Sequence, residues 1–185
     1  METKSSWSAA AGIDCTLAGA HSGPQQVFEA LAERMHPDLM QTERFLTAAA
    51  VALQPDHGTV DYVSAGHNDL LVYRAATGAV EAHPSDGTIL GFLPNPEYAT
   101  RQIEMRPGDC MLLYTDGIPE AMCESGEMFG EERLAALFGQ LASNRNAQRI
   151  LDALLQELDN FRGGQLGMDD VTAVVIRCTE GSTNR

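Results

Sequence analysis

Two groups of acidic residues lie where apolar runs of the sequence end or begin. Asp116 follows the apolar run 111–114 and stands before Gly117, whereas Asp169 and Asp170 directly precede the run 171–176. If these runs form adjacent antiparallel strands, the end of one meets the start of the other, and the carboxylates converge on one rim of the sheet. Carboxylate oxygens, with water in the remaining positions, are the ligands that Mg²⁺ and Mn²⁺ prefer. The spacing therefore indicates a candidate metal site.

Each of these acids also has a simpler interpretation. Asp-Gly is a common turn dipeptide, and an Asp before a strand is a common loop residue. Only the pairing of acids at opposite ends of two apolar runs favours metal ligands. Three weaker candidates are His67 as a catalytic acid or ligand, Asp86 beside the substrate, and Glu120 as a further acid near Asp116, and for each a structural role is favoured.

The segments that must position the acids follow from apolar periodicity and turn residues. A helix is expected over 25–35, after a capping box of Ser22 and Gln25 with Pro24 in its first turn, and Pro37 should end it. Strand pairs are expected over 45–65, around the turn 54–59, over 69–83, around Thr77-Gly78, and over 99–114, around Pro107-Gly108-Asp109. The Pro- and Gly-rich segment 84–98 is expected to be a loop.

Two helices and a last strand complete the expected elements. Leucine-rich stripes at spacings of three and four predict helices over about 131–140 and 147–161, the second ended by Gly163-Gly164. Residues 168–178 are expected to form the last strand. The pattern predicts an α+β fold, a mostly antiparallel sheet with helices set against it. We expect a poorly ordered lead-in at 1–22, one domain at 23–178 and a tail at 179–185.

The composition narrows the classes of partner. Twelve Lys and Arg against 26 Asp and Glu give a net charge of −14, which disfavours nucleic acid and anionic membranes because both are polyanions. Four cysteines without a CxxC pair indicate free thiols in a reducing compartment, with Cys110 and Cys178 in apolar runs. Because the sequence has no secretory signal and no apolar run of about 20 residues, we expect a soluble, cytoplasmic protein.

Six motifs resemble, in order and spacing, the SpoIIE-type branch of the metal-dependent protein phosphatases, the PPM family. They are "SAGHNDLLVYR", "GTILGFLPNPEY", "MRPGDCMLLYTDG", "YTDGIPEA", "GEMFGEERL" and "MDDVTAVVI". The resemblance covers about residues 25–177 and implies a β-sandwich flanked by helices that binds two Mn²⁺ or Mg²⁺ ions. It also implies hydrolysis of phosphoserine or phosphothreonine on a partner such as a phosphorylated anti-sigma-factor antagonist. By motif, Asp116 and Asp169 correspond to metal ligands, and no catalytic residue beyond a metal-activated water is implied.

The sequence departs from the family pattern at its N-terminal side. The family has two further metal-binding motifs upstream, neither is present here, and Asp14 is not assigned as a ligand. We therefore expect an incomplete domain that binds ions weakly. An uncovered sheet edge is a route to self-association, so a homodimer is among the expected assemblies. The alternative to an active phosphatase is an inactive phosphatase-fold module, or a fragment, that acts only in binding or regulation.

Overall fold

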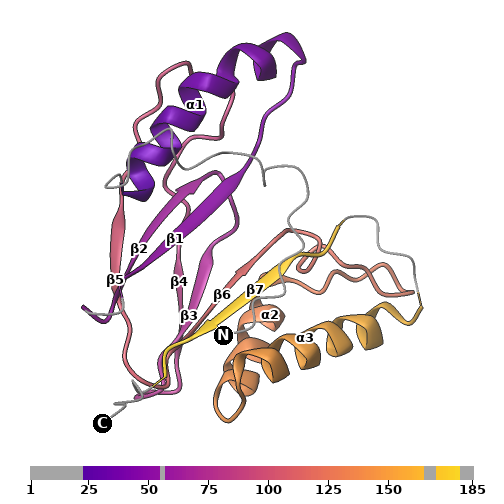
Figure 1. The fold of residues 1–185 in the computed structure, drawn as a ribbon. Coiled ribbons are helices and arrows are strands. Elements are labelled where there is room, and N and C mark those ends of the chain that lie inside the picture. Colours follow the sequence, from indigo (N-terminus) through magenta and orange to yellow (C-terminus); the bar gives the residue numbers. More distant parts are fainter. Residues whose placement is uncertain (1–22, 55–56, 165–169, 180–185) are drawn as a thin grey trace. The chain divides into compact units, whose positions relative to one another are not determined.

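The computed structural model describes residues 23–54, 57–164 and 170–179 (Figure 1). The expected α+β class with antiparallel sheets is confirmed, and the segment 84–98 contains no helix or strand. The predicted lead-in, Ser22, Asp169 and nearly all of the tail lie outside the described residues. The elements, in chain order, are α1 (Pro24–Gln41), β1 (Ala48–Gln54), β2 (Thr59–Ala65), β3 (Leu70–Tyr73), β4 (Val80–His83), β5 (Arg101–Glu104), β6 (Cys110–Tyr114), α2 (Glu131–Ala142), α3 (Ala147–Arg162) and β7 (Ala173–Arg177).

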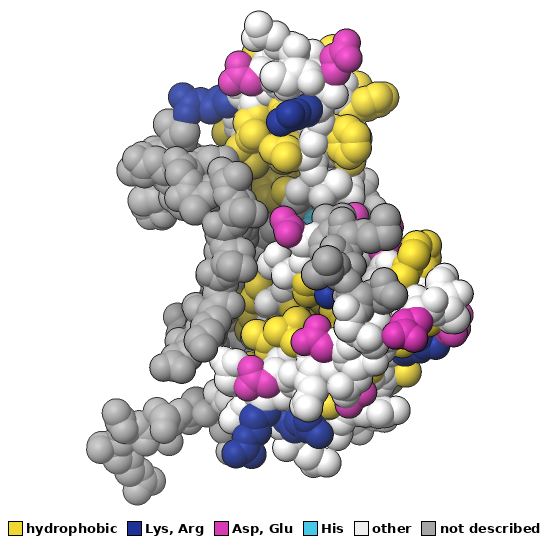
Figure 2. Space-filling model, turned by 90° about the vertical axis from the view of Figure 1, so that its right-hand side faces the viewer, with side chains coloured by type: hydrophobic (Ala, Val, Ile, Leu, Met, Phe, Trp, Pro, Cys, Tyr) yellow, Lys and Arg dark blue, Asp and Glu magenta, His cyan; other side chains and the backbone are white. Residues whose placement is uncertain are grey.

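The described residues divide into two compact units. Unit 1 contains residues 68–83, 106–164 and 170–179, and unit 2 contains 23–54, 57–67 and 84–105. On the face shown in Figure 2, acidic side chains are scattered over the surface and do not gather into one patch. Among the helices of the described residues, none is both long enough and apolar enough to span a membrane.

Unit 2 is a three-stranded sheet covered by one helix. Its strand order is β1-β2-β5, and both pairs are antiparallel. Helix α1 packs against β2 through Phe28 and Ala32, and Phe28 meets the ring of Tyr98 edge-on, with 5.5 Å between the ring centroids. The side chains of Val63 and Ala65, two residues apart on β2, belong to this core, as the strand period of two requires.

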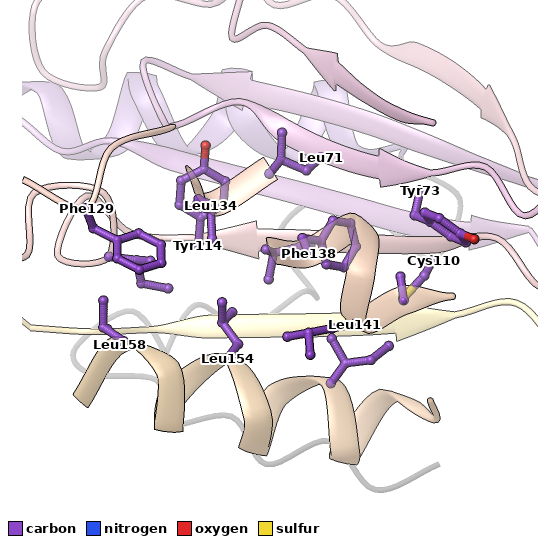
Figure 3. Close-up of a cluster of buried hydrophobic side chains, with 14 of the residues drawn as sticks. Leu71, Tyr73, Cys110, Tyr114, Phe129, Leu134, Phe138, Leu141, Leu154 and Leu158 are labelled. Atoms are coloured by element: carbon purple, nitrogen blue, oxygen red, sulfur yellow. The ribbon is translucent and has the colours of Figure 1, made fainter. Parts of the chain in front are cut away.

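Unit 1 is a four-stranded antiparallel sheet packed against α2 and α3. Its strand order is β4-β3-β6-β7. Alternate residues of β3 and β6 point toward the two helices, whose leucine stripes point back at them (Figure 3). The fully buried members of this core include Leu112, Leu134, Phe138, Ile150 and Leu154. Both helices begin at the residue that the sequence predicts, and Gly163, with φ 61°, ends α3 in the left-handed conformation that glycine adopts most readily.

The predicted strand pair over 99–114 is wrong. Strand β5 pairs with β2 in unit 2, whereas β6 pairs with β3 and β7 in unit 1. The turn at Pro107-Gly108-Asp109 exists, but the buried carboxylate of Asp109 ties it to the β3–β4 connection, because it accepts hydrogen bonds from the amides of Arg106 and Ala75. A local turn signal predicts that the chain reverses there, but it does not predict which strand each flanking strand pairs with.

The predicted end of the first helix at Pro37 is also wrong, since α1 continues to Gln41. Pro37 is exposed, and the turn beyond it buries Leu39 in the unit 2 core. Burial of this leucine offsets the one backbone hydrogen bond that the proline nitrogen cannot donate. At the other end, Pro24 occupies the first turn as expected, but Gly23 is the N-cap and provides no side-chain hydrogen bond.

Candidate metal site at the ends of β6 and β7

The candidate site depends on two neighbouring strands. Strands β6 and β7 are adjacent and antiparallel, with Tyr114 opposite Ala173 at one end of the pair and Cys110 opposite Arg177 at the other. The end of β6 therefore lies beside the start of β7, which is the arrangement that the candidate site requires. Asp116 and Asp170 are both exposed and lie two and three residues beyond the paired residues Tyr114 and Ala173. We call this end of the two strands the rim.

The backbone at Asp116 is fixed although its side chain is exposed. The amide of Ile118 donates to the carbonyl of Thr115 at 3.1 Å, and the amide of Glu120 donates to the carbonyl of Asp116 at 2.9 Å. Ile118 is completely buried and anchors this turn in the unit 1 core. The Asp116 carboxylate makes no hydrogen bond or ion pair with any other described residue. It is therefore a free acceptor on a rigid support.

A guanidinium group holds the same turn from the side of the helices. Nη2 of Arg162, the last residue of α3, donates to the carbonyl of Gly117 at 3.1 Å. Phe161, which precedes Arg162 in α3, meets Phe129 edge-on with 5.2 Å between the ring centroids, and the Arg133 guanidinium lies 4.6 Å from the Phe161 ring centroid. Such cation–π and aromatic contacts fix the segment that follows the turn.

Thr115 joins the end of β6 to the segment that enters β7. Its amide donates to the carbonyl of Thr172 at 3.0 Å. Its hydroxyl donates to the carbonyl of Asp170 at 3.0 Å and accepts from the amide of Thr172 at 2.9 Å. The sequence analysis did not identify Thr115 or Arg162. Because the partners of Thr115 lie 55 and 57 positions away, no local spacing could have identified its role.

The weaker candidates have structural contacts or solvent exposure. Nδ1 of His67 lies 3.4 Å from the Thr47 hydroxyl, and Asp86 forms an ion pair with Arg101, all within unit 2. Glu120 is exposed in the turn that follows Asp116. Asp169, the second predicted ligand, lies outside the described residues, so its role as a ligand stays a prediction, as does that of Asp116.

The donors at the rim fit a hard divalent cation. Mg²⁺ usually keeps several waters and takes only one or two carboxylates from the protein, and an exposed carboxylate such as that of Asp116 has the chemistry for this role. Within residues 23–54, 57–164 and 170–179, no three His, Cys, Asp or Glu side chains gather closely enough to hold an ion.

Several solved structures with a similar fold are phosphatase domains. The SiaA-PP2C domain of Pseudomonas aeruginosa gives a TM-score of 0.72 at 20% identity, covering 84% of this chain and 61% of that one. The RsbU and RsbW domains of Rv1364c from Mycobacterium tuberculosis give 0.70 at 24% identity, covering 85% and 42%. The Mn-presoaked SpoIIE phosphatase domain of Bacillus subtilis gives 0.62 at 18% identity, covering 92% and 69%. At these identities the likeness shows the fold alone, and the fold is that of the PPM, or PP2C, phosphatases.

The sequence comparisons then give the family. The family model for SpoIIE, Stage II sporulation protein E, matches residues 3–179, so the chain belongs to the SpoIIE family. Protein IcfG of Synechocystis sp. is 28% identical over 151 residues, or 78% of this chain. Phosphoserine phosphatase RsbU of Bacillus subtilis is 24% identical over 154 residues, or 83% of this chain. The chain corresponds to only 23% of the length of IcfG and 45% of that of RsbU.

Proposed function

We propose that this chain is a metal-dependent phosphatase domain that removes phosphate from phosphoserine or phosphothreonine of a regulatory protein. Membership of the SpoIIE family supports the reaction class, and the relative RsbU is named a phosphoserine phosphatase. The observation that supports the proposal is the pairing of β6 with β7, which brings Asp116 and Asp170 to the same end of the sheet. Asp169 directly precedes Asp170 in the sequence.

In this proposal, Asp116 and Asp169 are the protein ligands of Mn²⁺ or Mg²⁺. A bound ion would supply an activated water and neutralise the phosphoryl oxygens. The protein contributes a rigid turn that holds the Asp116 carboxylate in an exposed position, accessible to a phosphate on another protein. No protein nucleophile is required. Because the chain carries a net charge of −14, a phosphorylated segment would be repelled from it without a cation at the rim.

For the substrate, we propose a phosphorylated anti-sigma-factor antagonist encountered in the cytoplasm. The motif resemblance supports this class of partner, and the similar M. tuberculosis structure contains an RsbW domain in addition to its RsbU domain. A single phosphoserine or phosphothreonine exposed on a folded partner can reach an open rim more easily than it can reach the bottom of a deep pocket. The same assay, run with other phosphorylated proteins, would identify a substrate of another kind.

A second candidate function is a phosphatase-fold module that binds a phosphoprotein without turning it over. It is favoured by the ligand count in the described residues, where no three potential ligands come together. In that case the chain would bind Mn²⁺ weakly and release no phosphate, while still binding the phosphorylated partner in preference to the unphosphorylated one.

Phosphate release from a phosphoserine protein, with and without Mn²⁺, tests the proposal. We expect Mn²⁺-dependent turnover that falls at least about 100-fold in Asp116→Asn and in Asp169→Asn. Glu120→Gln is the matched control, because it removes another exposed acid from the same turn and should keep the activity. Turnover that is independent of Mn²⁺, or unchanged in Asp116→Asn, would rule out the proposed site. Absence of turnover with retained partner binding would favour the second candidate.

A further inference from the structure

The hydrogen bonds of Thr115 depart from the regular pattern of an antiparallel pair. In a hydrogen-bonded pair, each residue donates its amide to the carbonyl of the other. The Thr115 amide does donate to the Thr172 carbonyl, but the Thr172 amide donates to the Thr115 hydroxyl instead of the carbonyl. The Thr115 carbonyl accepts from the amide of Ile118, which closes the Asp116 turn.

The Thr115 hydroxyl thus serves as the acceptor for the Thr172 amide in place of the Thr115 carbonyl, which accepts a hydrogen bond within the turn. This replacement lets the chain reverse at Asp116 while the contact with the β7 side extends one residue pair beyond the ends of the two strands. The two partners also determine where the hydroxyl hydrogen points. Because the Asp170 carbonyl can only accept, the Thr115 hydroxyl donates its hydrogen to that carbonyl, while its oxygen accepts from the Thr172 amide. Only a side chain that accepts and donates at one atom can make both bonds, and among side chains of this size only Thr and Ser do so.

We propose that Thr115 is a positioning residue for the candidate metal site. Thr115 is bonded directly to Asp116 in the chain, and its hydroxyl donates a hydrogen bond to the backbone carbonyl of Asp170, the residue that directly follows Asp169 in the sequence. Through one oxygen atom it therefore sets the spacing between the backbone at Asp116 and the backbone at Asp170, the residue next in sequence to the second proposed ligand. The inference rests on the proposed function. It assigns Thr115 no contact with the ion or the substrate.

The test compares Mn²⁺ affinity and amide exchange in variants of the full chain. Thr115→Val keeps the shape of the side chain but removes both hydroxyl bonds, and Thr115→Ser keeps them. Calorimetric titration with Mn²⁺ should show about 10- to 100-fold weaker binding in Thr115→Val and binding within about threefold of wild type in Thr115→Ser. Hydrogen exchange at the Thr172 amide, measured by NMR without metal, should be faster in Thr115→Val and unchanged in Thr115→Ser.

The control is Thr77→Val, which removes a hydroxyl from the exposed turn between β3 and β4, where it accepts from the amide of Ala79 at 3.3 Å. This variant should leave Mn²⁺ binding and Thr172 exchange unchanged. Equal Mn²⁺ affinity in wild type and a folded Thr115→Val, or unchanged exchange at Thr172, would overturn the positioning role alone. If Thr115→Val does not fold, weaker binding in Thr115→Ser by more than about tenfold has the same meaning. A wild type without Mn²⁺ binding overturns the proposed function together with this inference.

Discussion

Asp116 and Asp109, two carboxylates of unit 1, differ in what surrounds them. Asp109 is 3% exposed and accepts from the amides of Ala75 and Arg106 and from the Arg74 guanidinium. The side chain of Asp116 is exposed, and its carboxylate accepts from no described group. A buried carboxylate whose oxygens all accept hydrogen bonds from the protein has a structural role, whereas an exposed carboxylate without such bonds is available to a ligand. This contrast, more than sequence position, separates the two acids.

Replacing Asp109 should destabilise the fold. Asp109→Asn removes the charge that faces Arg74 and one acceptor of a backbone amide, so we expect a loss of about 2–4 kcal/mol in the free energy of unfolding, measured with urea. Glu81→Gln is the control. The hydrogen bond with Glu81 raises the pKa of Arg74 more than that with Asp109 does, but the Glu81 side chain is 48% exposed and solvent screens the pair. Its loss should cost at most about 1 kcal/mol. Equal losses in the two variants would contradict the role given to Asp109.

The buried thiol of Cys110 in unit 1 makes the stability of the fold dependent on pH. Burial raises the pKa of Cys110 to about 12, whereas in the unfolded chain the thiol titrates near 9. Between these values the folded state holds a proton that the unfolded state has lost, so stability is fully present below pH 9 and falls as the pH rises toward 12. Cys110→Ala should show a shallower fall, by up to about 1.4 kcal/mol per pH unit. A fall of the same slope in the variant would assign it to other groups.

At the scale of elements, α1 contains a local conflict between sequence and structure. Pro37→Ala would restore the backbone donor within the helix and remove the clash of the proline ring with the preceding turn. We expect stabilisation of about 1–3 kcal/mol in thermal or urea unfolding. Leu39→Ala, in the same turn, should instead destabilise, by about 2–5 kcal/mol, because it empties part of the unit 2 core. A destabilised Pro37→Ala would mean that the proline restricts the unfolded chain more than it strains the helix.

Elements with a local signal could be predicted from the sequence, and the pairing of distant ones could not. The leucine stripes of α2 and α3, Gly163, and the turns of the β1–β2 and β3–β4 pairs all act within a few residues. The division of β5 and β6 between two sheets depends instead on contacts at Asp109 and Thr59 that no local pattern specifies. The site follows the same rule. The rim follows from two strand ends, but the bonds of Thr115 span more than fifty residues.

At the scale of the whole molecule, net charge is the dominant surface property. The described exposed ion pairs Arg74–Glu81, Arg101–Asp86 and Arg133–Glu127 contribute little each, whereas a net charge of −14 is repulsive throughout. Raising NaCl from about 0.02 M to about 0.5 M should therefore raise the Tm by about 2–4 °C. The same screening favours the predicted homodimer, which light scattering at both salt concentrations would detect. A lower Tm in salt would show that the ion pairs outweigh the repulsion.

The long separation between Thr115 and its partners has a kinetic consequence. Their bonds close loops of 55 and 57 residues, so the entropy of loop closure must be overcome before the rim can form. Strand pairing of this kind is slow compared with the formation of α2 and α3, which the chain completes in between. The two helices can therefore form before the rim, and any affinity for a cation should arise in the last phase of folding. A Mn²⁺-sensitive signal during refolding would then report the arrival of β7 beside β6.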